Sequence, residues 1–309
     1  MKWILGVSIL AVTMGWAAMA TIPVAAVSVD EASLKFLPPE TQGIVVIDVA
    51  ALRSAPLVQD MLKQQVSGPR SWDDSISRTG VDVARDIDKV TVAKISAQDG
   101  LVIAQGRIDK FKVEQALKDS GKVMDAYLGQ IIYRDGENAV LVLDNAVLLG
   151  QLNAVKKAVD QMQLPGAQPL RSDLAAAIQT IEAGNQIWGV GNFSTTDLGL
   201  VGVRGPAPVI EMLKAIKSGT GQLRVDTGIH ARGTAVFADA DSAKNLSDLV
   251  RGALAVAKLQ IAKQQPDMSQ ILDGVQVSSN GNMMTVRVEE SGELLKKLNT
   301  TRVRAALGK

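Results

Sequence analysis

The sequence lacks cysteine and contains a single histidine, His230. Without cysteine there are no disulfides, no thiol catalysis, no cysteine-ligated iron–sulfur clusters and no covalently attached c-type haem. One histidine cannot assemble the usual zinc sites, which combine several histidines and cysteines. We therefore predict no cofactor, no metal site and no catalytic residue. A catalytic triad would need a serine and an acidic residue beside His230, so we expect this strand histidine to face solvent or pair with a neighbour.

Aromatic residues are also scarce, at 3% of the chain against 47% hydrophobic residues, so the core must be mostly aliphatic. Basic and acidic residues nearly balance in the full chain. Without residues 1–20, which contain the single charged residue Lys2, their numbers are equal. A nucleic-acid-binding protein would carry a basic surplus. We predict that nucleic acid is not a partner.

The amino terminus has the pattern of a secretory signal peptide. Lys2 precedes an apolar stretch that runs to about Trp16, and Ala18-Met19-Ala20 is a small-x-small cleavage triplet. We predict cleavage after residue 20 and a periplasmic or extracellular location. An uncleaved membrane anchor is the alternative, since no charged residue occurs between Lys2 and Asp30. Pro23 and the weak basic flank argue against a permanent anchor.

A Pro/Gly-rich segment, residues 163–169, separates two halves of similar length and is typical of a linker. The rest of the chain is long enough for two medium domains. The predicted domains are a signal peptide over 1–20, an exposed lead-in over 21–33, a first lobe over 34–162, a linker over 163–169, a second lobe over 170–299 and a basic tail over 300–309.

Each half alternates short apolar strands, hairpins and helices. A buried strand is expected over residues 44–48, a hairpin over 89–104, and a second hairpin around Asn280-Gly281, the strongest turn signal in the chain. Helices are expected over 109–118 and 152–162. Strict βαβ alternation is absent, so the sequence predicts an α+β fold with two similar lobes, each a mostly antiparallel sheet with helices packed on one face.

One long helix is expected to begin at an Ala240-Asp241-Ser242 cap and to run to about Lys263. Its segment 246–261 is apolar around much of its circumference. Helices of this kind are usually buried. We therefore expect a core helix, with a protein interface as the alternative.

Two segments resemble uncharacterised exported bacterial proteins of two-lobed α+β build. The first is Leu37-Pro38-Pro39-Glu40-Thr41 with the strand that follows it, and the second is the run 139–145. The resemblance spans most of the mature chain and rests on short patterns. It implies an envelope location, and it implies no catalytic residue.

Acidic residues cluster in one loop, where Asp82, Asp86 and Asp88 lie near Arg85 and Lys89. A solvated turn of mixed charge is the expected arrangement, and a loop cation site is the alternative.

The carboxyl-terminal region carries five positive side chains and no acidic one. Positive residues near a final helix end suit the helix dipole, and contact with an anionic envelope surface is the functional alternative. The candidate interaction residues are Lys296, Lys297, Arg302, Arg304 and Lys309.

The missing catalytic sets favour a non-enzymatic exported envelope protein that binds or scaffolds another macromolecule. Its partner would be an envelope protein or an anionic envelope surface, with membrane contact only if the signal is uncleaved. The alternative is a carrier that holds a small apolar ligand in a cleft between the lobes, as the aliphatic composition and ten methionines suggest. A hydrolase acting through Ser, Asp and Glu alone is a third hypothesis.

Overall fold

The structure is a computed structural model that describes residues 31–64, 81–166, 168–192, 207–262 and 266–295. It divides into two compact units along the chain, which we call the first unit (residues 26–189) and the second unit (residues 190–309). The predicted signal peptide and most of the predicted lead-in lie outside the described residues. Within the described part, no helix combines the length and the apolar character needed to cross a membrane.

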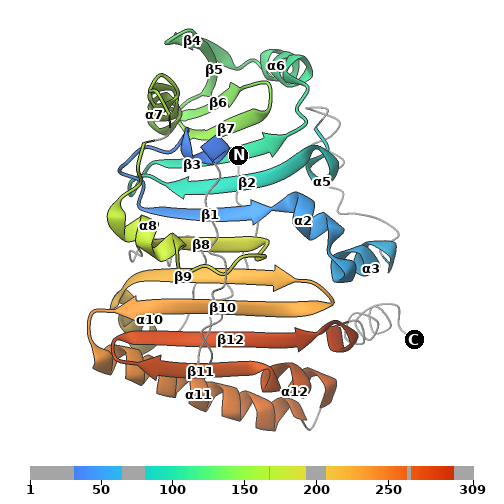
Figure 1. Cartoon of the computed structure of the whole chain (residues 1–309), viewed down its shortest axis with the longest axis vertical. Coiled ribbons are helices and arrows are strands. Elements are labelled where there is room, and N and C mark those ends of the chain that lie inside the picture. Colours follow the sequence, from blue (N-terminus) through green and yellow to red (C-terminus); the bar gives the residue numbers. More distant parts are fainter. Residues whose placement is uncertain (1–30, 65–80, 167, 193–206, 263–265, 296–309) are drawn as a thin grey trace. The chain divides into compact units, whose positions relative to one another are not determined.

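The first unit is built on an antiparallel sheet (Figure 1). Its strands follow the order β8-β1-β2-β3-β7-β6-β5-β4, so β4 forms one end. The strands are β1 (Gly43–Asp48), β2 (Ile87–Lys94), β3 (Gly100–Gly106), β4 (Val123–Tyr127), β5 (Gln130–Asp135), β6 (Asn138–Val142), β7 (Ala146–Gln151) and β8 (Ile187–Asn192), at which the unit ends.

Two helices of the first unit, α2 and α6, begin at side-chain caps. The described helices are α1 (Glu31–Leu34), α2 (Val49–Ser54), α3 (Pro56–Gln64), α5 (Val83–Asp86), α6 (Lys110–Asp119), α7 (Leu152–Met162) and α8 (Ser172–Ile178). Asp48 accepts the Ala51 amide at 2.7 Å to cap α2. Asp109 caps α6 in the same way, accepting the Lys112 amide at 3.1 Å. Helix α7 packs on β3, β6 and β7 through four fully buried side chains: Ala154, Val155, Ala158 and Val159.

The second unit contains a sheet of strands in the order β11-β12-β10-β9 (Figure 1). These are β9 (Ile216–Val225), β10 (Gly228–Phe237), β11 (Val275–Asn280) and β12 (Met283–Ser291), and every pairing among them is antiparallel. The predicted hairpin at Asn280-Gly281 is confirmed, with Gly281 at a φ of 54°. Only glycine adopts that left-handed conformation without steric cost.

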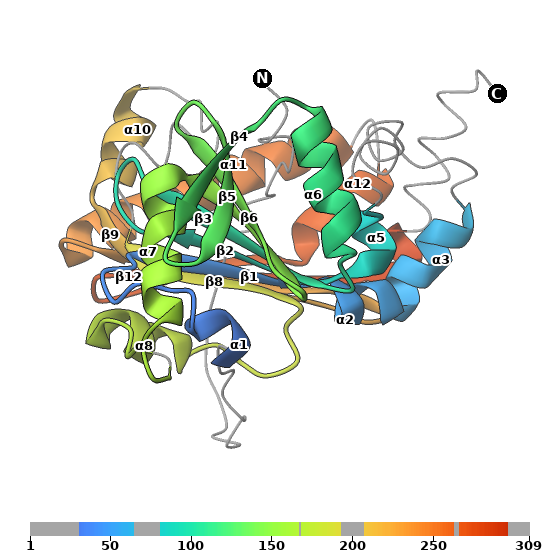
Figure 2. The same cartoon turned by 90° about the horizontal axis from the view of Figure 1, so that it is seen from above.

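Three helices of the second unit share one face of this sheet (Figure 2). They are α10 (Ala207–Lys214), α11 (Ala240–Ala262) and α12 (Pro266–Asp273). Alternate strand residues supply the core beneath them, which includes Phe237, Met284 and Val286, and α11 adds Ala243 and Leu246. The side chains of the intervening strand residues point to the opposite face of the sheet.

The α+β fold and the antiparallel sheet strands predicted from the sequence are confirmed. Strand β4 was not predicted, because its residues Val123–Tyr127 mix apolar and acidic side chains without a clear alternation. The predicted linker at 163–169 falls within the first unit, which continues through α8 to Gly189. The predicted domain limits and the similarity of the two lobes stay predictions.

Candidate functional site

The face of the second sheet opposite the described helices α10, α11 and α12 is polar in successive rows that cross its strands; we call it the polar face. In one row, Arg232 of β10 lies opposite Gln222 of β9 on one side and Arg287 of β12 on the other. Gln276 of β11 completes this row beyond Arg287. Because side chains alternate between the two faces of a strand, all four project from the same side of the sheet.

A row of hydroxyl groups lies next to the arginine row. It consists of Thr220, Thr234, Thr285 and Ser278, one residue from each strand. The Thr285 and Thr234 hydroxyl oxygens are 3.4 Å apart. Thr285 and Gln222 are buried.

On the other side of the arginine row, charged groups surround His230. This residue lies opposite Arg224 on one neighbouring strand and Glu289 on the other. Its Nδ1 contacts Glu289 Oε2, and its Nε2 lies 3.2 Å from Asp226 Oδ1. Arg224 Nε lies 3.4 Å from Asp226 Oδ2, and Arg287 Nε lies 3.9 Å from Glu289 Oε1. These five side chains form a partly exposed ionic network.

The turn between β9 and β10 holds Asp226 in place. Its carboxylate accepts the Gly228 amide at 3.0 Å, and this contact, followed in effect by the contact with His230, lowers the pKa of Asp226. Gly228 approaches the neighbouring strand closely, because a Cβ on it would lie 2.4 Å from the Glu290 carbonyl oxygen. The turn therefore requires glycine at position 228 and holds the Asp226 carboxylate beside the histidine.

The network explains what His230 does locally. The prediction that this histidine pairs with a neighbour or faces solvent is confirmed, since it does both, with a side chain 33% exposed. Each ring nitrogen faces a carboxylate oxygen. Neither nitrogen is therefore oriented toward a hydroxyl group that it could activate as a base.

The arginine row itself was missed at the sequence level. Its signal is the alternation of polar residues with small or apolar ones in β9, β10 and β12, where Gln222, Arg232 and Arg287 each occupy a polar position. Alternation identifies the face on which a side chain lies, but register between strands decides which side chains meet. The sequence does not give that register.

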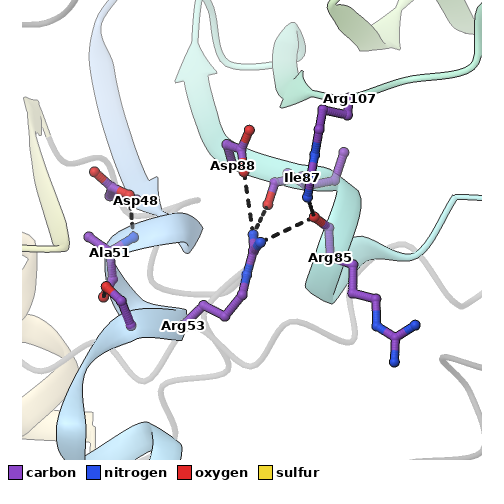
Figure 3. A network of polar contacts seen from close by, with 8 residues as sticks. Asp48, Ala51, Arg53, Arg85, Ile87, Asp88 and Arg107 are labelled. Carbon is purple, nitrogen blue, oxygen red and sulfur yellow. Dashed lines mark hydrogen bonds and ion pairs between the residues drawn. The ribbon is translucent and has the colours of Figure 1, made fainter.

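A second polar cluster, in the first unit, has a structural role (Figure 3). Arg53 of α2 donates to the Ile87 carbonyl oxygen at 2.7 Å and to the Arg85 carbonyl oxygen at 3.1 Å, and it lies 3.5 Å from Asp88. Arg107 donates to the same Arg85 carbonyl. Both guanidinium groups bind main-chain acceptors, so they join α2 and the residue after β3 to α5 and the start of β2.

The acidic residues Asp82 and Asp86, beside this cluster, have hydrogen-bond and ion-pair partners within their own segment. Asp86 accepts the Asp82 amide at 2.8 Å, and Asp82 lies 3.4 Å from the Arg85 guanidinium. The opposite charges pair as expected, but the residues lie in α5 and β2 and directly before α5 rather than in a turn. Among the described residues, no group of three or more acidic or histidine side chains is arranged to hold a metal ion.

Two expectations for the long helix were wrong. Asp239, rather than Asp241, caps α11, because the helix begins at Ala240 and the Asp239 carboxylate accepts the Ser242 amide at 2.7 Å. The helix is not a core helix surrounded by protein within its unit, since Leu249, Val256 and Leu259 are exposed. Only a narrow stripe near its start is buried against the sheet: Ala243, Leu246 and Ser247.

The predicted interaction residues of the basic tail, Lys296, Lys297, Arg302, Arg304 and Lys309, lie outside the described residues. The proposal of an anionic surface contact there stays a prediction.

Comparison with known proteins adds a likeness of fold. No protein-family model matches the sequence, and no curated protein matches it. A crystal form III structure of TP0453, a treponemal protein, has a TM-score of 0.50 at 11% identity and covers 89% of this chain and 99% of its own. A crystal form I structure of the same protein has a TM-score of 0.49 at 11% identity, with 89% and 98% covered. At this identity, the likeness shows that a bacterial protein shares the fold, and nothing about activity.

Proposed function

We propose that this chain is a non-enzymatic protein of the bacterial cell envelope that binds another protein through the polar face of its second unit. The observation that carries the proposal is the direct cross-strand pairing of Arg232 with Arg287. Like charges directly opposite each other destabilise a sheet. An anionic group bound between the two guanidinium groups would offset the repulsion between them.

The neighbours of the arginine pair suit a hydrogen-bonded ligand. Gln276 extends the row beyond Arg287, and a row of hydroxyl groups runs parallel to it. A guanidinium group binds a carboxylate through two parallel N–H donors, which adds geometric selectivity to the electrostatic attraction. We infer that acidic side chains of the partner protein bind at the arginine pair.

The charge balance favours a protein partner over an anionic lipid surface. Diffuse attraction to a lipid surface requires a cluster of basic residues with little opposing charge. The polar face instead places Asp226 and Glu289 among its three arginines, and the carboxylates are engaged in ion pairs. Such an alternating pattern selects a partner of complementary pattern, because wrongly placed like charges are repelled.

The test is retention of envelope proteins by the immobilised mature chain, residues 21–309. The double variant Arg232→Gln/Arg287→Gln should retain the specific partner at least about tenfold less well, as expected for loss of a paired charge contact. The control variant Lys110→Gln/Lys112→Gln removes two positive charges from α6 in the first unit and should bind normally. Equal retention by both variants would refute the polar face as the binding surface.

A further inference from the structure

Strand β4, at the end of the first sheet, is a second candidate binding site and is separate from the polar face. Among the strands that the structure describes, β4 pairs with β5 alone, through a two-residue turn at Leu128-Gly129. In such a hairpin the residues that flank the turn, here Tyr127 and Gln130, form a hydrogen-bonded pair, and hydrogen-bonded and non-hydrogen-bonded pairs then alternate. Met124 and Ala126 therefore direct their amide and carbonyl groups away from β5, toward the edge of the sheet.

This edge is apolar as well as unpaired. Four large apolar side chains on the hairpin are between 44% and 59% exposed: Val123, Met124, Leu128 and Ile131. Natural sheets normally protect such an edge with charged side chains, proline or a covering element, because an exposed apolar edge invites another strand. A cluster of exposed apolar residues of this kind marks an interaction site in a folded protein.

The charged residues near the hairpin do not protect the edge, because they are engaged in ion pairs. Lys122 pairs with Asp135, and Asp125 lies 3.6 Å from Arg134 and 3.8 Å from Lys156. The Tyr127 hydroxyl donates to Asp160 of α7 at 2.8 Å. These contacts hold the hairpin against α7 and leave its apolar edge fixed in place.

The turn residue Leu128 adds an independent argument. Its φ is 46°, and it is the non-glycine residue of the described chain with a positive φ. Hairpin turns of this kind favour Asn or Gly, and a bulky apolar residue in the left-handed region is an outlier that costs free energy. The Leu128 side chain is more than half exposed, so burial within the unit does little to offset that cost. This is expected for a residue that is buried by a partner.

We infer that the outer edge of β4 is a docking site for an extended apolar segment of a partner protein, which adds to the first sheet as an antiparallel strand. Main-chain hydrogen bonds from Met124 and Ala126 supply affinity, and the side chains of Met124, Leu128 and Ile131 supply selectivity for apolar residues. The unpaired main-chain groups are the observation that identifies the occupant, because only an extended chain presents matching donors and acceptors along an edge.

The experiment titrates the mature chain with a capped synthetic heptapeptide of alternating valine and threonine and follows main-chain amide NMR signals. We expect the largest shifts at Met124 and Ala126. Ala126→Pro, which removes an outward amide without breaking a bond to β5, should weaken binding at least about fivefold, and Met124→Lys should do the same if the proline variant does not fold. The control Phe111→Ser removes an apolar side chain 77% exposed on α6 and should bind normally.

Two results would overturn the inference. One is equal binding of a heptapeptide N-methylated at alternate residues, which cannot pair as a strand. The other is a response of the same signals to phosphatidylcholine vesicles but not to the peptide, which would assign the edge to a lipid surface. The variant Arg232→Gln/Arg287→Gln should bind the heptapeptide normally, so failure of the polar-face proposal and failure of this one are distinguishable.

Discussion

The two faces of the second sheet are built from the same strands and differ in what they do. On β12, Met284 and Val286 are buried beneath the helices, whereas Arg287 and Glu289, on the other face, stay partly exposed. One strand therefore carries the core and the candidate binding surface on alternate residues. Substitutions of neighbouring residues on one strand should therefore have different effects: those on the core face should lower stability, and those on the polar face should weaken binding.

One residue departs from this division. Glu290 lies on the core face, where it is only 8% exposed, and its Oε1 is buried without a hydrogen-bond partner. The carboxylate packs on Gly274, because a Cβ there would lie 2.2 Å from Glu290 Oε1. A buried carboxylate without a partner lowers stability, so this site is where the core face should be weakest.

The largest effect expected on the core face comes from Phe237→Ala. Phe237 is 1% exposed within the core of the second unit, so truncation should lower the free energy of unfolding by about 3–5 kcal/mol. Arg287→Gln on the polar face should change it by less than about 0.5 kcal/mol. Urea unfolding monitored by circular dichroism measures both, and similar losses would abolish the distinction between the faces.

Gly274→Ala should come next in size. The new methyl group would meet both Glu290 Oε1 and the Glu289 carbonyl oxygen, the latter at 2.3 Å. Overpacking of this kind typically costs about 1–3 kcal/mol. The matched control is Gly252→Ala in α11, where a Cβ meets nothing within 4 Å, so alanine should stabilise the helix by about 0.5–1 kcal/mol. Equal effects of the same sign would contradict the close packing at Gly274.

Glu290→Gln should change how stability depends on pH. Burial, and then the nearby charge of Asp273, raises the pKa of Glu290. The folded state therefore binds this proton more tightly than the unfolded state, so stability falls as the pH rises from the ordinary glutamate pKa through the raised one. Glutamine removes that fall and should make the protein more stable at neutral pH.

Thermal unfolding from pH 4 to 8 measures the effect of Glu290→Gln. The exposed Glu137→Gln in the first unit is the control and should leave the pH profile unchanged. A glutamine variant at 290 that loses stability at neutral pH would show instead that the carboxylate has a stabilising partner.

The sequence predicted local structure better than it predicted the surface. Helix Leu152–Met162 and the Asn280-Gly281 hairpin depend on neighbouring residues, and both are confirmed. The arginine pair depends on the register of two strands 55 residues apart in sequence, which no local pattern encodes. For the same reason the edge position of β4 could not be predicted.

The long helix shows a second reason for the limits of sequence patterns. Its apolar residues around the circumference predicted burial, yet Leu259 is 72% exposed. Burial depends on which neighbouring elements lie against a helix, and only Ala243, Leu246 and Ser247 of this 23-residue helix are buried.

The central claim is that Arg232 and Arg287 bind an acidic segment of a partner protein. Replacing these two residues should change stability least of all the substitutions, and it gives the most direct test of the claim. The measurement is the melting temperature of the wild type and of Arg232→Gln/Arg287→Gln, each with and without a capped hexaglutamate peptide. A ligand that binds only the folded state raises the melting temperature as its concentration exceeds its Kd. We predict that hexaglutamate raises the melting temperature of the wild type and leaves that of the double variant unchanged. An equal rise in both proteins, or no rise in either at millimolar peptide, would contradict the assignment of the polar face.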